Sequence, residues 1–185
     1  ANLLHRQMVQ FLDFRRLNVQ QTSLSYFPID LIRLLKDKMF AFRVLADKKN
    51  IDFSLECGLS EFTIKTDEKI IDKVVSNLIS NAIKYTDENK EILFELAKGG
   101  DKVIITITDQ GIGIPEMEQK KLFERFFRAE NAANIQGTGL GLHIVKQYTE
   151  LMGGAVQFKS QVGVGSVFTI ELPINYSENE KSTFN

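Results

Sequence analysis

The stretch GTGLGLHIVKQYTELMGG, residues 137–154, begins as a glycine-rich loop and continues as a helix. Its apolar residues recur with helical spacing, and the closing glycine pair is typical of a helix end. Glycine at three alternate positions, Gly137, Gly139 and Gly141, allows positive backbone dihedral angles, so successive amides can point at one anion beside the helix N-terminus. The stretch therefore predicts a phosphate cradle that can change shape. It is not a Walker A loop, because the lysine and hydroxyl residue of that pattern are missing.

The segments on either side of this loop predict further helices and paired strands. Pro28 suits the first turn of a helix, and Asp67 suits the cap of another. Two short alternating runs around the turn GLSE predict a hairpin. The predicted elements are helices over 28–50, 68–85 and 142–152, and strands over 51–57, 62–66, 91–99, 101–109, 155–163 and 165–173.

Strand pairs interleaved with three helices predict an α+β fold, with an antiparallel or mixed sheet covered by helices on one face. At 185 residues and 21.0 kDa, the chain has room for one domain and an appended element. We divide it into an appended helix and linker (1–22), a main domain (23–175) and a polar tail (176–185).

Composition excludes several classes of function. A net charge of -1 and a pI near 6.2 give the chain no bulk attraction to nucleic acid or to an anionic membrane. The single cysteine, Cys57, excludes an internal disulfide, and with two histidines it cannot build a usual Cys/His zinc site. The apolar runs are too short to span a bilayer. These features fit a reducing, cytoplasmic setting.

The run NLISNAIKY places Asn77, Asn81 and Lys84 on one side of the predicted 68–85 helix. Two interpretations remain open at this point: a solvated face of an amphipathic helix, or a stripe that faces a ligand. An asparagine carbonyl is a suitable oxygen ligand for magnesium, which takes the rest of its shell from water and phosphate. Lys84 would then meet the same phosphates as a point charge.

The run DQGIGIP, residues 109–115, follows a predicted strand. Gly111 and Gly113 allow the backbone to approach a ligand closely, and the carboxylate of Asp109 could accept a hydrogen bond from an exocyclic amine such as that of adenine. Taken alone, the run is equally typical of an ordinary glycine turn after a strand.

In this order, the segments resemble the ATP-binding catalytic domain of a sensor histidine kinase, which has the Bergerat fold with a mixed, mainly antiparallel sheet. NLISNAIKY resembles the N box of that family, DQGIGIP its G1 box, FERFFR its F box and GTGLGL its G2 box. GVGSVFTIELP resembles its last glycine turn and closing strand. Each motif is weak singly, but five in sequence cover nearly the whole chain.

The resemblance implies ATP and Mg²⁺ as cofactors and assigns roles to residues. Asn81 would ligate magnesium, and Asp109 would contact the adenine amine. Asn77, Lys84 and Tyr85 would line the nucleotide pocket, with Asn77 and Lys84 as the catalytic residues. Residues 129–140 would form a mobile lid, with Arg128 reaching the phosphates and Phe123, Phe126 and Phe127 anchoring its base. The nucleotide-binding residues would be Asn77, Asn81, Lys84, Tyr85, Asp109, Gly111, Gly113, Arg128, Gly137, Thr138, Gly139, Leu140 and Gly141.

Residues 1–22 resemble the second helix of the family's dimerisation and phosphotransfer hairpin. The preceding helix, which should carry the phosphoacceptor histidine, does not occur in this sequence, and neither His5 nor His143 has the acceptor context. We therefore expect a fragment that binds Mg-ATP without phosphorylating itself. The implied partners are the phosphoacceptor helix of the parent protein and a response regulator receiver domain. The resemblance also implies that the parent is a homodimer, and it is compatible with a membrane anchor.

Two other functions remain as alternatives. Bergerat-fold hydrolases such as gyrase resemble this helix but carry a water-activating glutamate at the position of Asn77, and an amide is no general base. The third possibility is a non-catalytic module that senses nucleotide or docks a response regulator.

Overall fold

The computed structural model describes residues 24–174, so the expected appended helix (1–22) and polar tail (176–185) lie outside the described residues. The described elements are β1 (Phe27–Asp30), α2 (Leu31–Asp47), β2 (Asp52–Cys57), β3 (Thr63–Thr66), α3 (Glu68–Tyr85), β4 (Glu91–Gly99), β5 (Lys102–Asp109), α4 (Glu116–Gln119), the 3₁₀ helix η1 (Glu130–Ala132), α5 (Gly141–Leu151), β6 (Ala155–Gln161) and β7 (Gly165–Pro173). None of the helices in this part of the chain has the length and apolar character of a membrane span.

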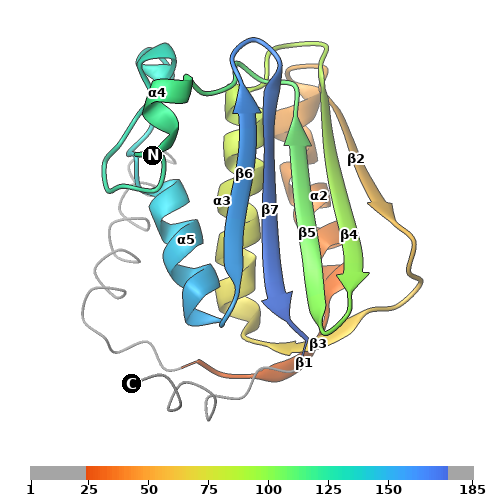
Figure 1. Ribbon diagram of the computed structural model, residues 1–185. Helices are drawn as coiled ribbons and strands as arrows, with labels where there is room; N and C mark the ends of the chain where they lie inside the picture. Colours follow the sequence, from red (N-terminus) through yellow and green to blue (C-terminus); the bar gives the residue numbers. More distant parts are fainter. Residues whose placement is uncertain (1–23, 175–185) are drawn as a thin grey trace, which may run out of the picture.

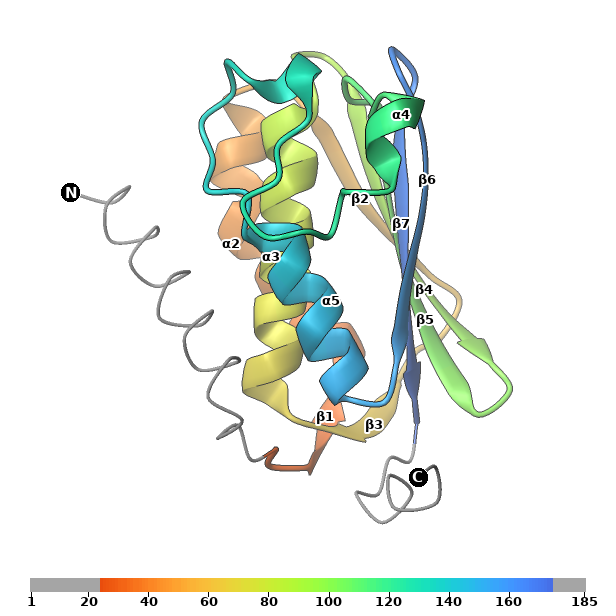
Figure 2. The ribbon, with the colours of Figure 1, turned by 60° about the vertical axis from the view of Figure 1, so that its left-hand side comes forward.

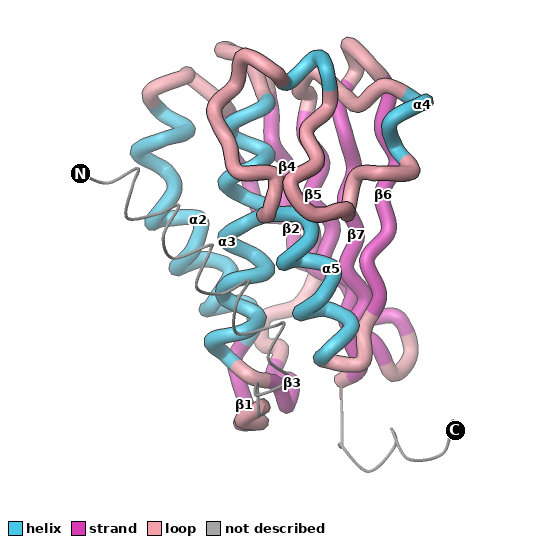
Figure 3. The backbone as a smooth tube through the Cα atoms, turned by 90° about the vertical axis from the view of Figure 1, so that its left-hand side faces the viewer, coloured by secondary structure: helices cyan, strands magenta, loops and turns pink. Residues whose placement is uncertain are grey.

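The fold has two layers, a twisted sheet and a layer of helices on one of its faces (Figure 1). The sheet has five strands in the order β2-β4-β5-β7-β6, with β2 and β4 parallel and the other pairs antiparallel. Helices α2, α3 and α5 all lie on the same side of this sheet, as the side view in Figure 3 shows. The α+β architecture with a mixed, mainly antiparallel sheet is therefore confirmed.

The core lies between these layers because strands and helices each present one apolar face. Along β4 and β5 every second residue is buried, as at Phe94 and Ile105, while the alternate residues face the open side of the sheet. Helix α3 fills the layer opposite with apolar residues such as Val75 and Ile79, both completely buried. Burying one such side chain contributes about 1.5–3 kcal/mol. The five-stranded sheet and α3 thus form a firm platform for the loops at one end.

The predicted hairpin between residues 51–57 and 62–66 is wrong. Strand β2 instead joins the main sheet beside β4, with Phe53 opposite Ile92, and β3 pairs antiparallel with β1 in a separate two-stranded sheet at the base (Figure 1). Pairing with β4 buries Phe53, whose ring lies 6.4 Å from that of Phe94 in an edge-to-face contact. A partner elsewhere in the chain therefore replaces the local turn.

The start of α2 also differs from the prediction. Pro28 lies in β1, opposite Lys65, where a residue without an N–H is tolerated in an edge strand. The helix begins three residues later because the carboxylate of Asp30 accepts hydrogen bonds from the N–H groups of Ile32 (3.1 Å) and Arg33 (3.2 Å). It ends at Asp47, before the predicted boundary at residue 50.

Candidate functional site

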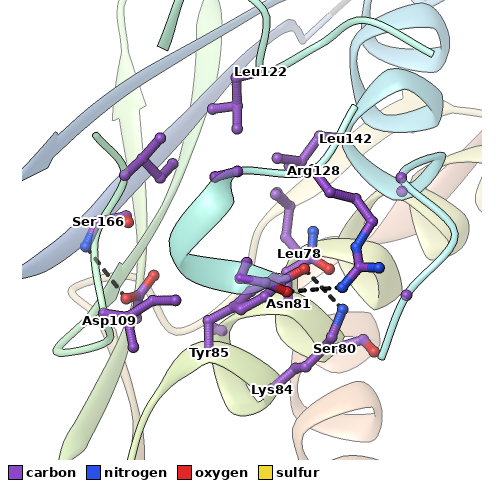
Figure 4. Close-up of a pocket in the computed structure, with 18 of the residues that line it drawn as sticks. Leu78, Ser80, Asn81, Lys84, Tyr85, Asp109, Leu122, Arg128, Leu142 and Ser166 are labelled. Atoms are coloured by element: carbon purple, nitrogen blue, oxygen red, sulfur yellow. Dashed lines mark hydrogen bonds between the residues drawn. The ribbon is translucent and has the colours of Figure 1, made fainter. Parts of the chain in front are cut away.

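The site lies where the C-terminal end of α3 meets the end of β5 and the loop before α5. Asp67 fixes the other end of α3: its Oδ1 accepts from the N–H groups of Lys69 (3.0 Å) and Ile70 (3.2 Å). Eighteen residues later the helix ends at Tyr85, so its last turns project polar side chains into one pocket (Figure 4). Of the predicted residues on α3, Asn81, Lys84 and Tyr85 line this pocket, whereas Asn77 does not.

The ammonium of Lys84 is held at the edge of the loop that contains Gly137. Its Nζ donates to the Tyr85 hydroxyl at 2.7 Å and lies 4.3 Å from the centre of that ring. A Cβ at residue 137 would meet the same Nζ, so a larger residue here would require the Lys84 side chain to move. None of the ion pairs among the described residues involves Lys84. Its positive charge is therefore not neutralised by a carboxylate and suits an anionic ligand.

The two asparagines of α3 face the beginning of α5. A Cβ added to Gly141 would lie 3.2 Å from Oδ1 of Asn77 and within 4 Å of both amide atoms of Asn81. Asn77 also donates from Nδ2 to the carbonyl of Lys73 at 2.8 Å, one turn earlier in its own helix. Asn77 therefore lies behind Asn81, against the first turn of α5.

The first turn of α5 has no hydrogen bond from a capping side chain. Helix N-termini without a side-chain cap have N–H groups available to an anion. The turn is joined to the pocket by Thr138, whose hydroxyl accepts from the N–H of Leu140 at 3.3 Å. Gly137, Thr138, Gly139 and Gly141 all line the pocket. This arrangement fits the predicted phosphate cradle.

Two details of the cradle differ from the prediction. Only Gly139 has a positive φ, of 71°; a Cβ at residue 137 would displace the Lys84 ammonium, and one at residue 141 would lie 3.2 Å from Oδ1 of Asn77. Leu140 was expected among the ligand contacts, but it is 2% exposed and packs in the hydrophobic core. Its apolar side chain anchors the loop to the core.

Asp109 lies at the end of β5, on the opposite side of the pocket from Arg128 (Figure 4). The residue is 7% exposed, and its Oδ1 accepts from the N–H groups of Gly111 (2.9 Å) and Ser166 (3.2 Å). Burial raises the pKa of this carboxyl to about 6, against the lowering effect of the two N–H donors. Because both hydrogen bonds reach Oδ1, Oδ2 is the oxygen that can accept from a ligand amine.

The turn after Asp109 is docked on the end of α3. The N–H of Ile112 donates to the carbonyl of Tyr85 at 3.1 Å, and a Cβ on Gly111 would lie 2.6 Å from that carbonyl oxygen. Gly111 therefore makes room for the protein's own backbone, which corrects the expectation that it approaches a ligand. Gly113, with a φ of 66°, does line the pocket.

The loop from 129 to 140 lies beside α3, at the end of the molecule where α5 begins (Figure 2), and several of its residues line the pocket. Its first half is held by two side chains. Arg128 donates from Nη2 to the carbonyls of Ala132 (2.7 Å), Ala133 (2.9 Å) and Ile135 (2.6 Å). Asn131 donates to the carbonyl of Gly113 at 2.9 Å. In this structure the guanidinium of Arg128 therefore organises the lid backbone, while its contact with phosphates stays a prediction.

The three phenylalanines at the base of the lid have different positions. Phe123 packs edge-to-face on Phe158, with 5.7 Å between ring centres, and Phe127 lines the pocket. Phe126 is 60% exposed and has a φ of 62°; its backbone N–H donates to Gly139 at 3.1 Å. The positive φ turns its side chain outward, so Phe126 is tied to the lid through its backbone.

Several pocket residues escaped the sequence prediction. Ser166 contributes a backbone N–H, and a backbone group cannot be recognised from the residue type. The sequence shows only a small residue directly after Gly165; its pairing opposite Asp109 appears in the structure. Asn131 is one of several polar residues in the lid and could not be singled out. The other missed lining residues are Leu78, Ser80, Ala82, Ile107, Ile112, Ile114, Leu122, Leu142 and Phe168.

The described residues contain no group of three or more His, Cys, Asp or Glu side chains that could hold a metal. A divalent cation in this pocket would therefore depend on amide oxygen and on the oxygens of a bound phosphate. That donor set fits magnesium, which keeps several waters and takes few protein ligands. Asn81 is the pocket residue able to provide the amide oxygen at the end next to Gly141.

Comparison with known proteins places this geometry in a family. The model of the family described as histidine kinase-, DNA gyrase B-, and HSP90-like ATPases matches residues 66–176. The circadian input-output histidine kinase CikA of Synechococcus elongatus is 34% identical over 166 residues, 88% of this chain and 22% of CikA. The catalytic domain of histidine kinase ThkA has a TM-score of 0.74 and 31% identity, over 82% of this chain and 97% of that one.

A second structure shows ThkA in complex with the response regulator protein TrrA; it has a TM-score of 0.76 and 27% identity, over 94% of this chain and 48% of that one. The family match extends from the end of β3 through β7 and so includes every element that forms the pocket. The chain belongs to the family of histidine kinase-, DNA gyrase B- and HSP90-like ATPases, and within it is the ATP-binding catalytic domain of a sensor histidine kinase.

Proposed function

We propose that this domain binds Mg-ATP and donates the γ-phosphoryl group to a histidine on a dimerisation helix of its parent protein, for onward transfer to an aspartate of a response regulator. The observation that carries the proposal is the meeting of three groups in one pocket: the carboxylate of Asp109, the polar end of α3 and the loop before α5. The chain spans 22% of the length of CikA.

One side of the pocket suits adenine. Oδ2 of Asp109 can accept from the exocyclic amine, and apolar side chains such as Ile107 and Phe168 line the space beside it. At neutral pH the carboxyl, with a pKa of about 6, is mostly ionised and acts only as an acceptor. A flat apolar base with one donor amine matches this surface.

The other side suits the phosphates. Lys84 supplies a full positive charge, and the first turn of α5 supplies N–H groups. Asn81 would hold magnesium, with Asn77 one turn before it on α3; when bound, the ion would offset the charge of the phosphates. Phosphoryl transfer depends mainly on such positioning and charge stabilisation, because the protein makes no covalent bond itself.

The nucleophile should come from another segment of the parent. In the transfer step, a lone pair on an imidazole nitrogen forms the bond to the γ-phosphorus as the bond to the ADP oxygen breaks. His143 lies inside α5, directly after the glycine loop, and the sequence around it lacks the acceptor context; its Nδ1 is hydrogen-bonded to the carbonyl of Phe123 at 3.0 Å. His5 lies outside the described residues.

The hydrolase alternative has little support in the pocket. Among the described residues that line it, Asp109 is the one carboxylate, and two backbone N–H groups already bind its Oδ1. Asn77 is an amide and cannot take a proton from water. A module that only docks a response regulator would have no need for this pocket, whereas one that senses nucleotide would share it with the kinase. We therefore favour the kinase, with a homodimeric parent and a cytoplasmic location for this domain. A receiver domain as partner is supported by the similar structure of ThkA in complex with the response regulator protein TrrA.

Calorimetric titration with a non-hydrolysable ATP analogue, with and without Mg²⁺, tests the proposal. We expect magnesium-assisted binding by the wild type that is lost in Asn81→Ala and Asp109→Asn, while Asp52→Asn, an exposed carboxylate on β2, keeps it. With γ-labelled ATP the chain alone should gain no acid-labile label. Failure of the wild type to bind the analogue would contradict the nucleotide role, and label on the isolated chain would contradict the need for a separate acceptor.

A further inference from the structure

Lys49, in the turn after α2, binds the end of α3. Its Nζ donates to the carbonyls of Ile83 (2.9 Å), Lys84 (3.2 Å) and Thr86 (2.7 Å). An ammonium has three donors, and all three are used here. The adjacent Lys48 is exposed and makes none of these bonds.

These contacts complete the C-terminal cap of α3. The last four carbonyls of a helix have no partner inside it. In α3 the carbonyl of Ala82 accepts from the N–H of Thr86 at 3.0 Å, and that of Tyr85 accepts from Ile112 at 3.1 Å. The two carbonyls between them, of Ile83 and Lys84, are those that Lys49 binds. A single side chain therefore satisfies half of the helix end, and its charge opposes the negative end of the helix dipole.

The turn that carries Lys49 is itself braced against the loop after α3. The carbonyl of Lys49 accepts from the N–H of Asn89 at 3.1 Å, and Asn50 donates to the Asn89 side chain at 2.7 Å. Both asparagines have a positive φ, 50° and 61°, which this residue type tolerates. Lys49 thus approaches α3 from a fixed backbone.

The helix turn bound by Lys49 is the one that enters the pocket. It carries the side chains of Lys84 and Tyr85, and the Tyr85 carbonyl holds the turn that follows Asp109. We propose that Lys49 is a positioning residue for nucleotide binding, which acts by fixing the last turn of α3 and through it the ammonium of Lys84. The inference rests on the proposed binding of ATP and deepens it.

The test is the dissociation constant for a non-hydrolysable ATP analogue with Mg²⁺, measured well below the melting temperature. Lys49→Met keeps the length of the side chain but removes its donors, and Lys48→Met is the matched control. We expect about tenfold weaker binding for Lys49→Met and less than a twofold change for Lys48→Met, since a tenfold loss corresponds to about 1.4 kcal/mol, the scale of a lost charge-assisted hydrogen bond. Lys49→Arg, which keeps the charge and the donors, should restore most of the affinity.

A double-mutant cycle with Lys84→Met distinguishes the proposed effect of Lys49 on nucleotide affinity from a general effect on the structure. If Lys49 acts through Lys84, its removal in the Lys84→Met background changes affinity less than twofold. An equal loss in both backgrounds, or wild-type affinity in folded Lys49→Met, overturns the inference; Lys49→Gln takes its place in the cycle should the Met variant not fold. Failure of the wild type to bind the analogue overturns the proposed function and this inference together. If the wild type binds but the Lys49 variants do not show the expected changes in affinity, only the inference about Lys49 is overturned.

Discussion

Replacing Asp109 with asparagine should make the nucleotide-free domain more stable at neutral pH. The carboxyl is buried at the end of β5, and burial raises its pKa from 3.8 to about 6. The folded state therefore binds this proton more tightly than the unfolded chain does, and ionisation opposes folding. Asparagine has nearly the same shape, is neutral at every pH, and keeps an Oδ1 that can accept from the N–H groups of Gly111 and Ser166.

The magnitude and the pH window follow from the same two pKa values. A difference of about two units corresponds to about 3 kcal/mol at 1.36 kcal/mol per unit. The stability associated with protonated Asp109 is fully present below about pH 4, decreases as the pH rises toward 6, and is lost above that. At pH 8 Asp109→Asn should exceed the wild type by up to about 3 kcal/mol, and at pH 5 by about half as much.

Urea denaturation of both proteins from pH 5 to pH 8 measures this difference directly. Other carboxyl groups titrate in the same range, but they are common to both proteins and cancel in the difference. Asp52→Asn is the control, because Asp52 is exposed on β2 and should give a difference near zero at every pH. A variant that is no more stable than the wild type at pH 8, or a difference that does not change with pH, would refute the reasoning.

Three further outcomes are expected. Adenosine, which does not titrate between pH 5 and 8, should bind about tenfold more weakly at pH 5 than at pH 8, because Asp109 is mostly protonated at pH 5 and the ionised carboxylate is the better acceptor for the adenine amine; titrations of the wild type and of Asp52→Asn across this range should both show the trend, and its absence from the wild type would contradict this role of Asp109. Asp67→Ala should lower the free energy of unfolding by about 2 kcal/mol and Asp30→Ala by about 1 kcal/mol, as measured from urea midpoints. Both residues cap helices, but Asp67 is also buried and accepts a hydrogen bond from the N–H of Ser25 at 2.8 Å. Gly111→Ala, whose Cβ would lie 2.6 Å from a backbone oxygen of α3, should weaken both folding and analogue binding, while Gly58→Ala, with open space, should change neither in melting and binding assays.

The sequence predicts the parts of the fold whose signals are local. The apolar spacing of 68–85 and its cap at Asp67 agree with α3, and the glycine turns agree with the β4–β5 and β6–β7 pairs. The β2 and β3 hairpin was wrong because both runs alternate equally well with any partner. In the structure β2 pairs with β4 and β3 with β1. This pairing depends on the burial of residues such as Phe53 in a core that forms only when distant segments meet.

The same distinction applies to the site. Asn81, Lys84, Tyr85 and Asp109 were predicted because their side chains carry the chemistry, and all four line the pocket. Ser166 leaves no such mark because it contributes a backbone N–H. Lys49 leaves none because its side chain reaches α3 only after two turns of the chain are folded against each other. Their roles become visible only when donors and acceptors are matched in three dimensions.

The departures from ordinary folding rules gather around the pocket. Asp109 is a buried carboxylate, α5 begins without a side-chain cap, and Phe126 is a bulky residue at positive φ beside the lid. Elsewhere in the described chain the positive φ of non-glycine residues falls on asparagines, and α2 and α3 both begin with an aspartate cap. A cost of about 3 kcal/mol at Asp109 alone is a large part of the 5–15 kcal/mol by which a domain is usually stable. Such costs are typical of sites that bind a ligand, so the pattern of local strain points to the same pocket independently of any family likeness.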